Sequence, residues 1–175
     1  MMLSVFILAV SALTTDGESL DTIRVFDASY AKDLAEGAHL PALSPVQDEV
    51  RVWSEAAFFD ATSGWVLTKS EVRFYSNARD SNKHPEANQG QWRLERTVRN
   101  GRKASALLSK FARLSALDGK SYTCGFDGSA YAIEGMVHGQ HFSFSAINPG
   151  FCQEAEARRV ARLVSELVRV VRSAP

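Results

Sequence analysis

One glutamate and two histidines stand close together late in the chain: Glu134, His138 and His141, with His84 farther upstream. Carboxylate and imidazole groups bind Zn²⁺ or transfer protons when they converge on one point. Two interpretations stay open. In the first, Glu134 and His141, together with His84, form the active site of a small periplasmic hydrolase or metal-dependent enzyme. In the second, Glu134 and His141 lie on a polar, solvent-facing side of a sheet. Since no third ligand on a rigid element is evident, we expect no metal and no cofactor.

A serine and a lysine form the second feature with catalytic chemistry. Ser29-Tyr30-Ala31-Lys32 matches the S-x-x-K pattern of penicillin-recognising enzymes, in which the lysine can activate the serine. The S-D-N and K-T-G elements that accompany this pattern are missing from the sequence, as are a P-loop, G-x-S-x-G, H-E-x-x-H and a dinucleotide fingerprint. We therefore interpret the pair as part of a short helix, and the sequence disfavours an enzyme of a familiar class.

Large aromatic side chains are concentrated between residues 49 and 98, on both faces of the strands expected there. They either fill the core or form an exposed contact patch, with the polar loop Asn77–Gln91 as its rim. Interfaces favour Trp, Tyr and Arg because these side chains combine contact area with a polar group. The candidate contact residues are Trp53, Trp65, Arg73, Tyr75, Arg79 and Trp92. We expect at least one of the three tryptophans to be exposed.

Alternating apolar residues predict the strands that would position these side chains. Three strands are expected at Glu49–Phe59, Trp65–Ser76 and Trp92–Val98, with a turn at Asp60–Gly64, followed later by a hairpin over Ala130–Ile147. A two-residue turn at His138-Gly139 sets the register of that hairpin. In this register Ile133 opposes Phe144, Gly135 opposes Phe142, and Glu134 shares the polar face with His141.

Apolar residues at helical spacing predict two main helices, one from Ala104 to Leu114 and one over Gln153–Val171, with Asn148 as the N-cap before Pro149. The order β-β-β-α-β-β-α indicates an α+β fold. We expect an antiparallel sheet of about five strands with both helices packed on one face. The domain would occupy residues 49–175, preceded by an extension over residues 13–48 with a short strand at Thr22–Phe26 and a helix at Ser29–Gly37.

The first residues and the cysteines indicate where the protein works. The segment Met1–Leu13 is apolar, and the residues that follow it are abruptly polar, which is typical of a secretory signal peptide over residues 1–12. A buried terminal strand or helix would also fit. Cys124 and Cys152 are the two cysteines, and one bridge suits an oxidising compartment, whereas free buried thiols are the alternative. We expect a periplasmic or secreted protein that is not inserted in a membrane after signal cleavage.

Charge excludes a generic polyanion binder, because 20 basic residues balance 20 acidic ones over 175 residues. Nucleic acid is therefore not an expected partner. The arginines of the last helix, Arg158, Arg162, Arg169 and Arg172, form either an ordinary solvated face or a docking stripe for an acidic partner. Taken together, the sequence predicts an exported, disulfide-stapled, non-catalytic protein of the cell envelope that binds a protein partner, in the manner of an inhibitor or immunity protein.

Overall fold

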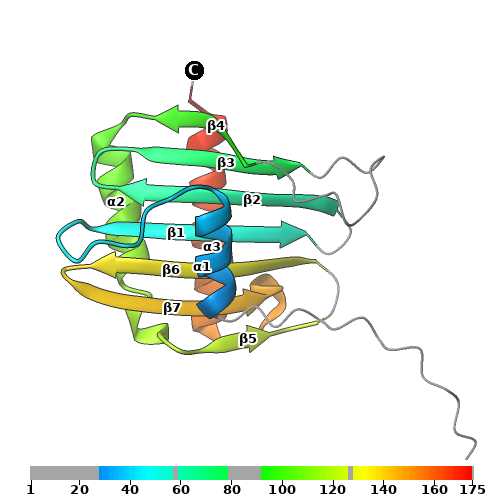
Figure 1. Ribbon diagram of the computed structural model, residues 1–175. Helices are drawn as coiled ribbons and strands as arrows, with labels where there is room; N and C mark the ends of the chain where they lie inside the picture. The colour runs from blue at the N-terminus through cyan, green and yellow to red at the C-terminus, as the bar shows by residue number, and fades with distance from the viewer. Residues whose placement is uncertain (1–27, 57–58, 79–91, 126–127, 175) are drawn as a thin grey trace, which may run out of the picture.

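A computed structural model describes residues 28–56, 59–78, 92–125 and 128–174. These residues contain a seven-stranded sheet with the strand order β4-β3-β2-β1-β6-β7-β5 (Figure 1). The strands are β1 (Glu49–Ala56), β2 (Phe59–Thr68), β3 (Val72–Ala78), β4 (Arg93–Val98), β5 (Ser121–Thr123), β6 (Ser129–Val137) and β7 (Gln140–Ile147). All neighbours are antiparallel except β5 and β7, which are parallel. The mixed α+β class is confirmed, but the expected five antiparallel strands were too few.

The two main helices lie together on one face of the sheet, as predicted, and a third helix, from the N-terminal extension, lies on the other face (Figure 1). Helices α2 (Gly101–Ala112) and α3 (Ala155–Arg172) cover one face, and α1 (Ala28–Gly37) crosses the other (Figure 1). The main core lies between the sheet and α2 and α3. A smaller core lies beneath α1, where Ala31, Ala35 and Ala38 pack against Trp53. The extension therefore contributes a helix that buries Trp53 and Ala132 on the second face of the sheet.

The first strands differ from the sequence prediction in their turns. The expected turn Asp60–Gly64 lies inside β2, and the expected strand Trp65–Ser76 is divided between β2 and β3. The division falls after Thr68, whose hydroxyl accepts hydrogen bonds from the backbone N–H groups of Ser70 and Glu71 at 3.4 and 3.3 Å. Pairing with β1 and β3 keeps the turn-prone residues extended, so sheet hydrogen bonds override local preference.

The hairpin of β6 and β7 forms in the predicted register. Ile133 pairs with Phe144, and Gly135 pairs with Phe142. His138 and Gly139 form the turn with φ values of 53° and 75°, the left-handed conformations that a tight two-residue hairpin needs. A Cβ on Gly135 would lie 2.5 Å from Phe142 Cζ, so the aromatic ring covers the glycine.

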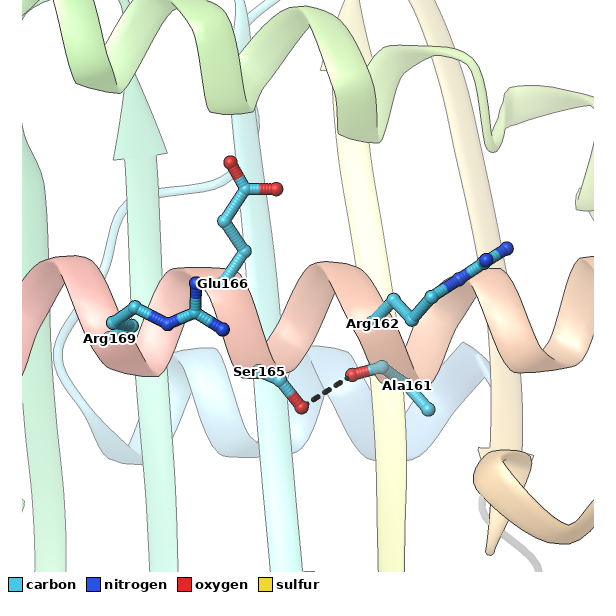
Figure 2. Close-up of a pocket in the computed structure, with 5 residues that line it drawn as sticks. All are labelled: Ala161, Arg162, Ser165, Glu166 and Arg169. Carbon is cyan, nitrogen blue, oxygen red and sulfur yellow. Dashed lines mark hydrogen bonds between the residues drawn. The ribbon is translucent and has the colours of Figure 1, made fainter.

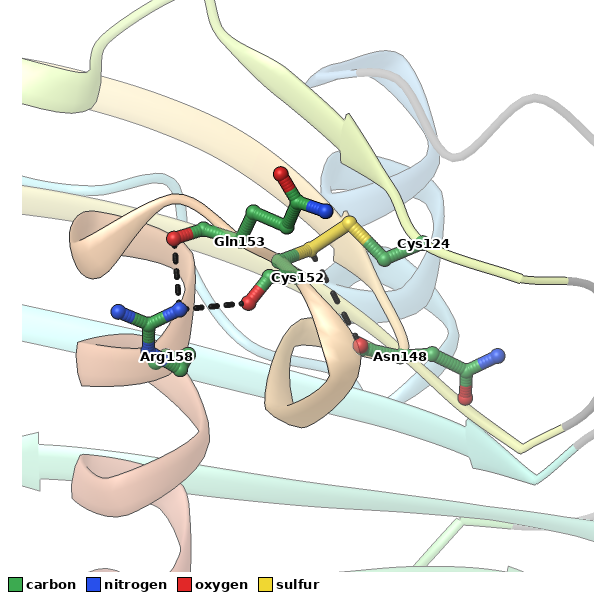
Figure 3. Close-up of a disulfide and its surroundings, with 5 residues drawn as sticks. All are labelled: Cys124, Asn148, Cys152, Gln153 and Arg158. Atoms are coloured by element: carbon green, nitrogen blue, oxygen red, sulfur yellow. Dashed lines mark hydrogen bonds between the residues drawn. A yellow bond between two sulfur atoms is a disulfide. The ribbon is translucent and has the colours of Figure 1, made fainter.

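The segment before α3 differs from the prediction. Asn148 adopts φ 50° and makes no side-chain cap, and Pro149–Phe151 forms a separate 3-10 turn, so α3 begins only at Ala155. The guanidinium of Arg158 donates to the carbonyls of Cys152 and Gln153 at 3.0 and 2.6 Å, which satisfies backbone acceptors ahead of the helix (Figure 3). Asn148 therefore does not cap α3, because the chain turns between Asn148 and the start of the helix and places Cys152 at the edge of the sheet.

The predicted disulfide between Cys124 and Cys152 is confirmed, with the two Cα atoms 5.1 Å apart (Figure 3). Cys124 follows β5, the edge strand that the sequence did not predict, and Cys152 lies just before α3. The bond therefore joins the edge of the sheet to the start of its main helix. It closes a loop of 28 residues in sequence separation, which restricts the unfolded chain.

Candidate functional site

The six candidate contact residues are divided between the two faces of the sheet. Trp53, Gly64 and Tyr75 occupy paired positions on β1, β2 and β3, so their side chains share the α1 side. Trp65 is on the opposite side, in the main core, where its ring lies 5.5 Å from that of Phe74. Adjacent positions on a strand point to opposite faces, which separates Trp65 from the other candidates. Four features predicted from the sequence lie outside the described residues: Arg79, His84, the signal peptide over residues 1–12 and the strand at Thr22–Phe26.

Burial changes the roles of the tryptophans. Trp53 and Trp65 are 0% and 6% exposed, so both are core residues and offer no contact area to a partner. Trp92 is half-buried and packs edge-on against Trp53, with 5.1 Å between ring centroids. Its indole also lies over the end of α1, 3.2 Å from where a Cβ on Gly37 would be. The expectation of an exposed tryptophan is therefore wrong, because two of the three are buried and Trp92 is half-buried.

A group of polar side chains lies on the α1 side of β3. Arg73 Nη1 donates to the hydroxyl of Tyr75 at 3.3 Å, and Arg73 Nε lies 3.5 Å from a carboxylate oxygen of Glu71. Two buried polar atoms, Trp53 Nε1 and Asn77 Oδ1, have no hydrogen-bond partner among the described residues, and a third, Arg73 Nε, has only its ion pair with Glu71. All three belong to residues on this same side of β1 and β3. Polar atoms in such positions are costly unless bonded, which marks this side as the polar part of the candidate site.

Strand β4 adds an exposed edge to this region. Its outer edge pairs with no other strand in the described part of the chain, so its free N–H and C=O groups can pair with an added strand. Leu94, paired with Tyr75 of β3, is 54% exposed, and its neighbours Arg93 and Glu95 are exposed as well. Apolar contact area and free backbone groups therefore coincide beside Trp92.

The alternative site at Glu134 is occupied by an ion-pair network. Arg51 Nε donates to Glu49 Oε1 at 2.6 Å, Arg51 Nη1 donates to Glu134 Oε1 at 3.4 Å, and Arg51 Nη2 donates to the carbonyl of Pro41 at 2.6 Å. All three charged residues are buried. Burial raises the pKa of Glu134 above its ordinary value, while the positive charge of Arg51 opposes the shift. This geometry makes Glu134 the counterion of a buried arginine.

The histidines do not complete a metal site with Glu134 in the described residues. His141 shares the α1 side with Glu134 as predicted, but it is exposed. His138 lies in the turn, where its backbone N–H donates to Asp48 Oδ1 at 2.7 Å. The one group of ligand atoms close enough to hold a metal there consists of Cys124, Cys152 and Glu154. It does not fit a metal, because its two sulfurs are bonded to each other.

None of the described helices has the length and apolar character to cross a bilayer. No protein-family model matches the chain, and no curated protein is significantly similar to it in sequence.

Proposed function

We propose that this chain is an exported, disulfide-stapled protein of the cell envelope that binds another protein along strand β4 and does not catalyse a reaction. The observation that carries the proposal is the position of Leu94, which is 54% exposed on an edge strand, next to the half-buried Trp92. A protein segment added as a further strand would cover Leu94 and satisfy the free backbone groups of β4.

The edge strand is held in place, which favours recognition by a preformed surface. Arg96 Nη1 donates to the carbonyls of Val171 and Ala174 at 3.0 and 3.1 Å and so ties β4 to the C-terminal end of α3. A rigid edge loses little conformational entropy on binding. The exposed charges of Arg93 and Glu95 flank Leu94 and would set the register and the choice of partner.

The disulfide supports export, because such bonds persist in oxidising compartments and are rare in the cytosol. The apolar segment Met1–Leu13 supports the same proposal. Within the cell envelope, binding without chemistry is the work of inhibitors and immunity-type proteins, and we place the chain in that class. Glu134 supports the non-catalytic part, since Arg51 and the buried network engage its carboxylate.

An affinity experiment with matched variants tests the proposal. The oxidised protein, recovered from its host with a C-terminal tag, is used to capture proteins from a cell-envelope extract, and the retained protein is identified by mass spectrometry and titrated. Leu94→Arg should weaken that binding by about 30-fold, the scale of a hot-spot residue. Val46→Arg is the control, because Val46 is 93% exposed and lies outside β4.

Two results would contradict the β4 site. Either unchanged affinity in Leu94→Arg or equal losses in Leu94→Arg and Val46→Arg would show that the captured protein binds elsewhere. Turnover of a substrate by the wild-type protein that Glu134→Gln abolishes would instead favour the hydrolase alternative.

A further inference from the structure

Positive charge is concentrated on the two helices that cover the main core. Helix α2 contains three basic residues and no acidic one, and α3 contains five basic and two acidic residues. These helices therefore carry six net positive charges, in a chain whose formal net charge is zero. The remainder of the chain carries six net negative charges. Although the whole chain has no net charge, the side of the sheet that α2 and α3 cover is therefore basic.

Four of the five arginines of α3 lie in a stripe on its outer side. Arg158, Arg162, Arg169 and Arg172 recur at spacings of three, four or seven residues, and Val160, Leu163, Val164, Leu167 and Val171 are buried on the opposite side. At about 1.5 Å per residue the stripe extends roughly 21 Å along the helix. Such a length matches an extended peptide of about six residues.

Several of these arginines are available to a ligand. Arg158 is engaged with the carbonyls of Cys152 and Gln153. Arg162, Arg169 and Arg172, by contrast, form no ion pair with any other described residue, and all three are exposed. The stripe thus presents three exposed guanidinium groups.

A depression of about 420 Å³ lies along this stripe, lined by Ala161, Arg162, Ser165, Glu166 and Arg169 (Figure 2). Glu166 bonds to Lys110 of α2 at 2.5 Å, so its carboxylate is neutralised from the neighbouring helix. Ser165 donates its hydroxyl to the carbonyl of Ala161 at 2.9 Å, which leaves the hydroxyl oxygen able to accept. Among the residues that line the depression, Arg162 and Arg169 are therefore the charged ones with no ion-pair partner in the described part of the chain.

We infer that the α2–α3 face, centred on Arg162 and Arg169, is a docking surface for an acidic segment of a partner protein, rich in Asp or Glu. The planar guanidinium group binds a carboxylate through two parallel N–H···O bonds, and all the basic residues of α3 are arginines rather than lysines. The surface lies across the sheet from α1, and the inference does not depend on binding at β4.

Other anionic partners fit this face less well. Stable attachment to a membrane surface needs apolar insertion or a second anchor besides charge, and the large exposed apolar residues of the described chain are Val46, Leu94 and Phe151, none of them on α2 or α3. Nucleic-acid-binding domains are typically strongly basic overall, whereas the pI of this chain is about 6.9. An acidic peptide needs only the local positive field and the depression.

Fluorescence anisotropy tests the inference with a labelled peptide of alternating Glu and Gly, about 12 residues long, and the full oxidised protein. Binding should weaken between about 50 and 300 mM NaCl, because salt screens exposed charges. Arg162→Glu and Arg169→Glu should each reduce affinity by about tenfold or more. Lys32→Glu is the control, since it makes the same charge change on α1, on the opposite face. Its effect should stay below about twofold.

Four results would overturn the inference. They are no binding at low salt, an equal loss of affinity in Lys32→Glu, tighter binding to vesicles of phosphatidylglycerol and phosphatidylcholine, and tighter binding to a single-stranded oligonucleotide of equal charge. Near-UV circular dichroism verifies that each variant is folded. Leu94→Arg should leave peptide binding unchanged, so failure of this inference and failure of the β4 proposal are separate outcomes.

Discussion

The indole ring of Trp53 on β1 lies over Gly64 of the neighbouring strand β2, so close that a Cβ on Gly64 would come within 2.4 Å of Trp53 Cζ3. The ring is completely buried and forms the floor of the core beneath α1. Glycine in the middle of a strand is normally unfavourable, but here it makes room for the largest side chain of that core.

Gly64→Ala should therefore destabilise the protein by about 1–3 kcal/mol, because the added methyl group overpacks a site with no free volume. Urea unfolding followed by tryptophan fluorescence measures the change. Gly101→Ala at the start of α2 is the control, since its Cβ would meet nothing closer than 3.7 Å. Equal stability of Gly64→Ala and wild type would mean that Trp53 moves aside at no cost.

Removing the disulfide should cost about 3.5 kcal/mol, the loop-closure entropy for a bridge of this length. The double variant Cys124→Ser/Cys152→Ser and the wild type are compared by urea unfolding without reductant. Reductant should destabilise the wild type and leave the double variant unchanged. Two free thiols in unreduced, unfolded wild-type protein would refute the bridge.

Glu134 should make stability depend on pH. Burial raises its pKa above the ordinary 4.5, so the folded state holds the proton more tightly than the unfolded state does. The stability contributed by this group is complete below pH 4.5 and is lost as the pH rises through the raised pKa. In the Glu134→Gln variant, this loss of stability with rising pH should disappear. The measurement is the free energy of unfolding of both proteins from pH 4.5 to neutrality. The exposed Glu156→Gln is the control, and parallel profiles for both variants would contradict the prediction.

Arg96 should hold the end of α3 against β4. Since its guanidinium donates to the carbonyls of Val171 and Ala174, Arg96→Ala should cost about 1 kcal/mol, the scale of an ordinary hydrogen bond, because the exposure of Arg96 weakens the effect of its charge. Hydrogen exchange should accelerate in the last turn of α3. Arg93→Ala, on the same strand, should leave that exchange unchanged, and equal rates in both variants would argue against the tie.

Export should leave a shortened chain. If residues 1–12 form a signal peptide, mass spectrometry of protein from the producing cell should find a chain that begins near Leu13. Recovery of soluble cytoplasmic protein that retains Met1 would end the proposal of export.

Local features of the sequence determined the best-predicted parts of the fold. The turn residues His138 and Gly139, together with strict alternation, were sufficient to give the register of β6 and β7, including the coverage of Gly135 by Phe142. The helical spacing of apolar residues located α2 and α3 to within a few residues. These elements are predictable because neighbouring residues supply both the conformational preference and the pattern of burial.

Tertiary contacts decided the rest. The sequence by itself determined the alternation of side chains within each strand, the presence of two cysteines and the net charge of zero. Only the folded chain decided that α1 covers Trp53, that Arg51 neutralises Glu134, and that the arginines of α3 join the lysines of α2 in one basic face. Each of these depends on which distant segments pack together, and packing between segments is set by the whole core rather than by any local run of residues.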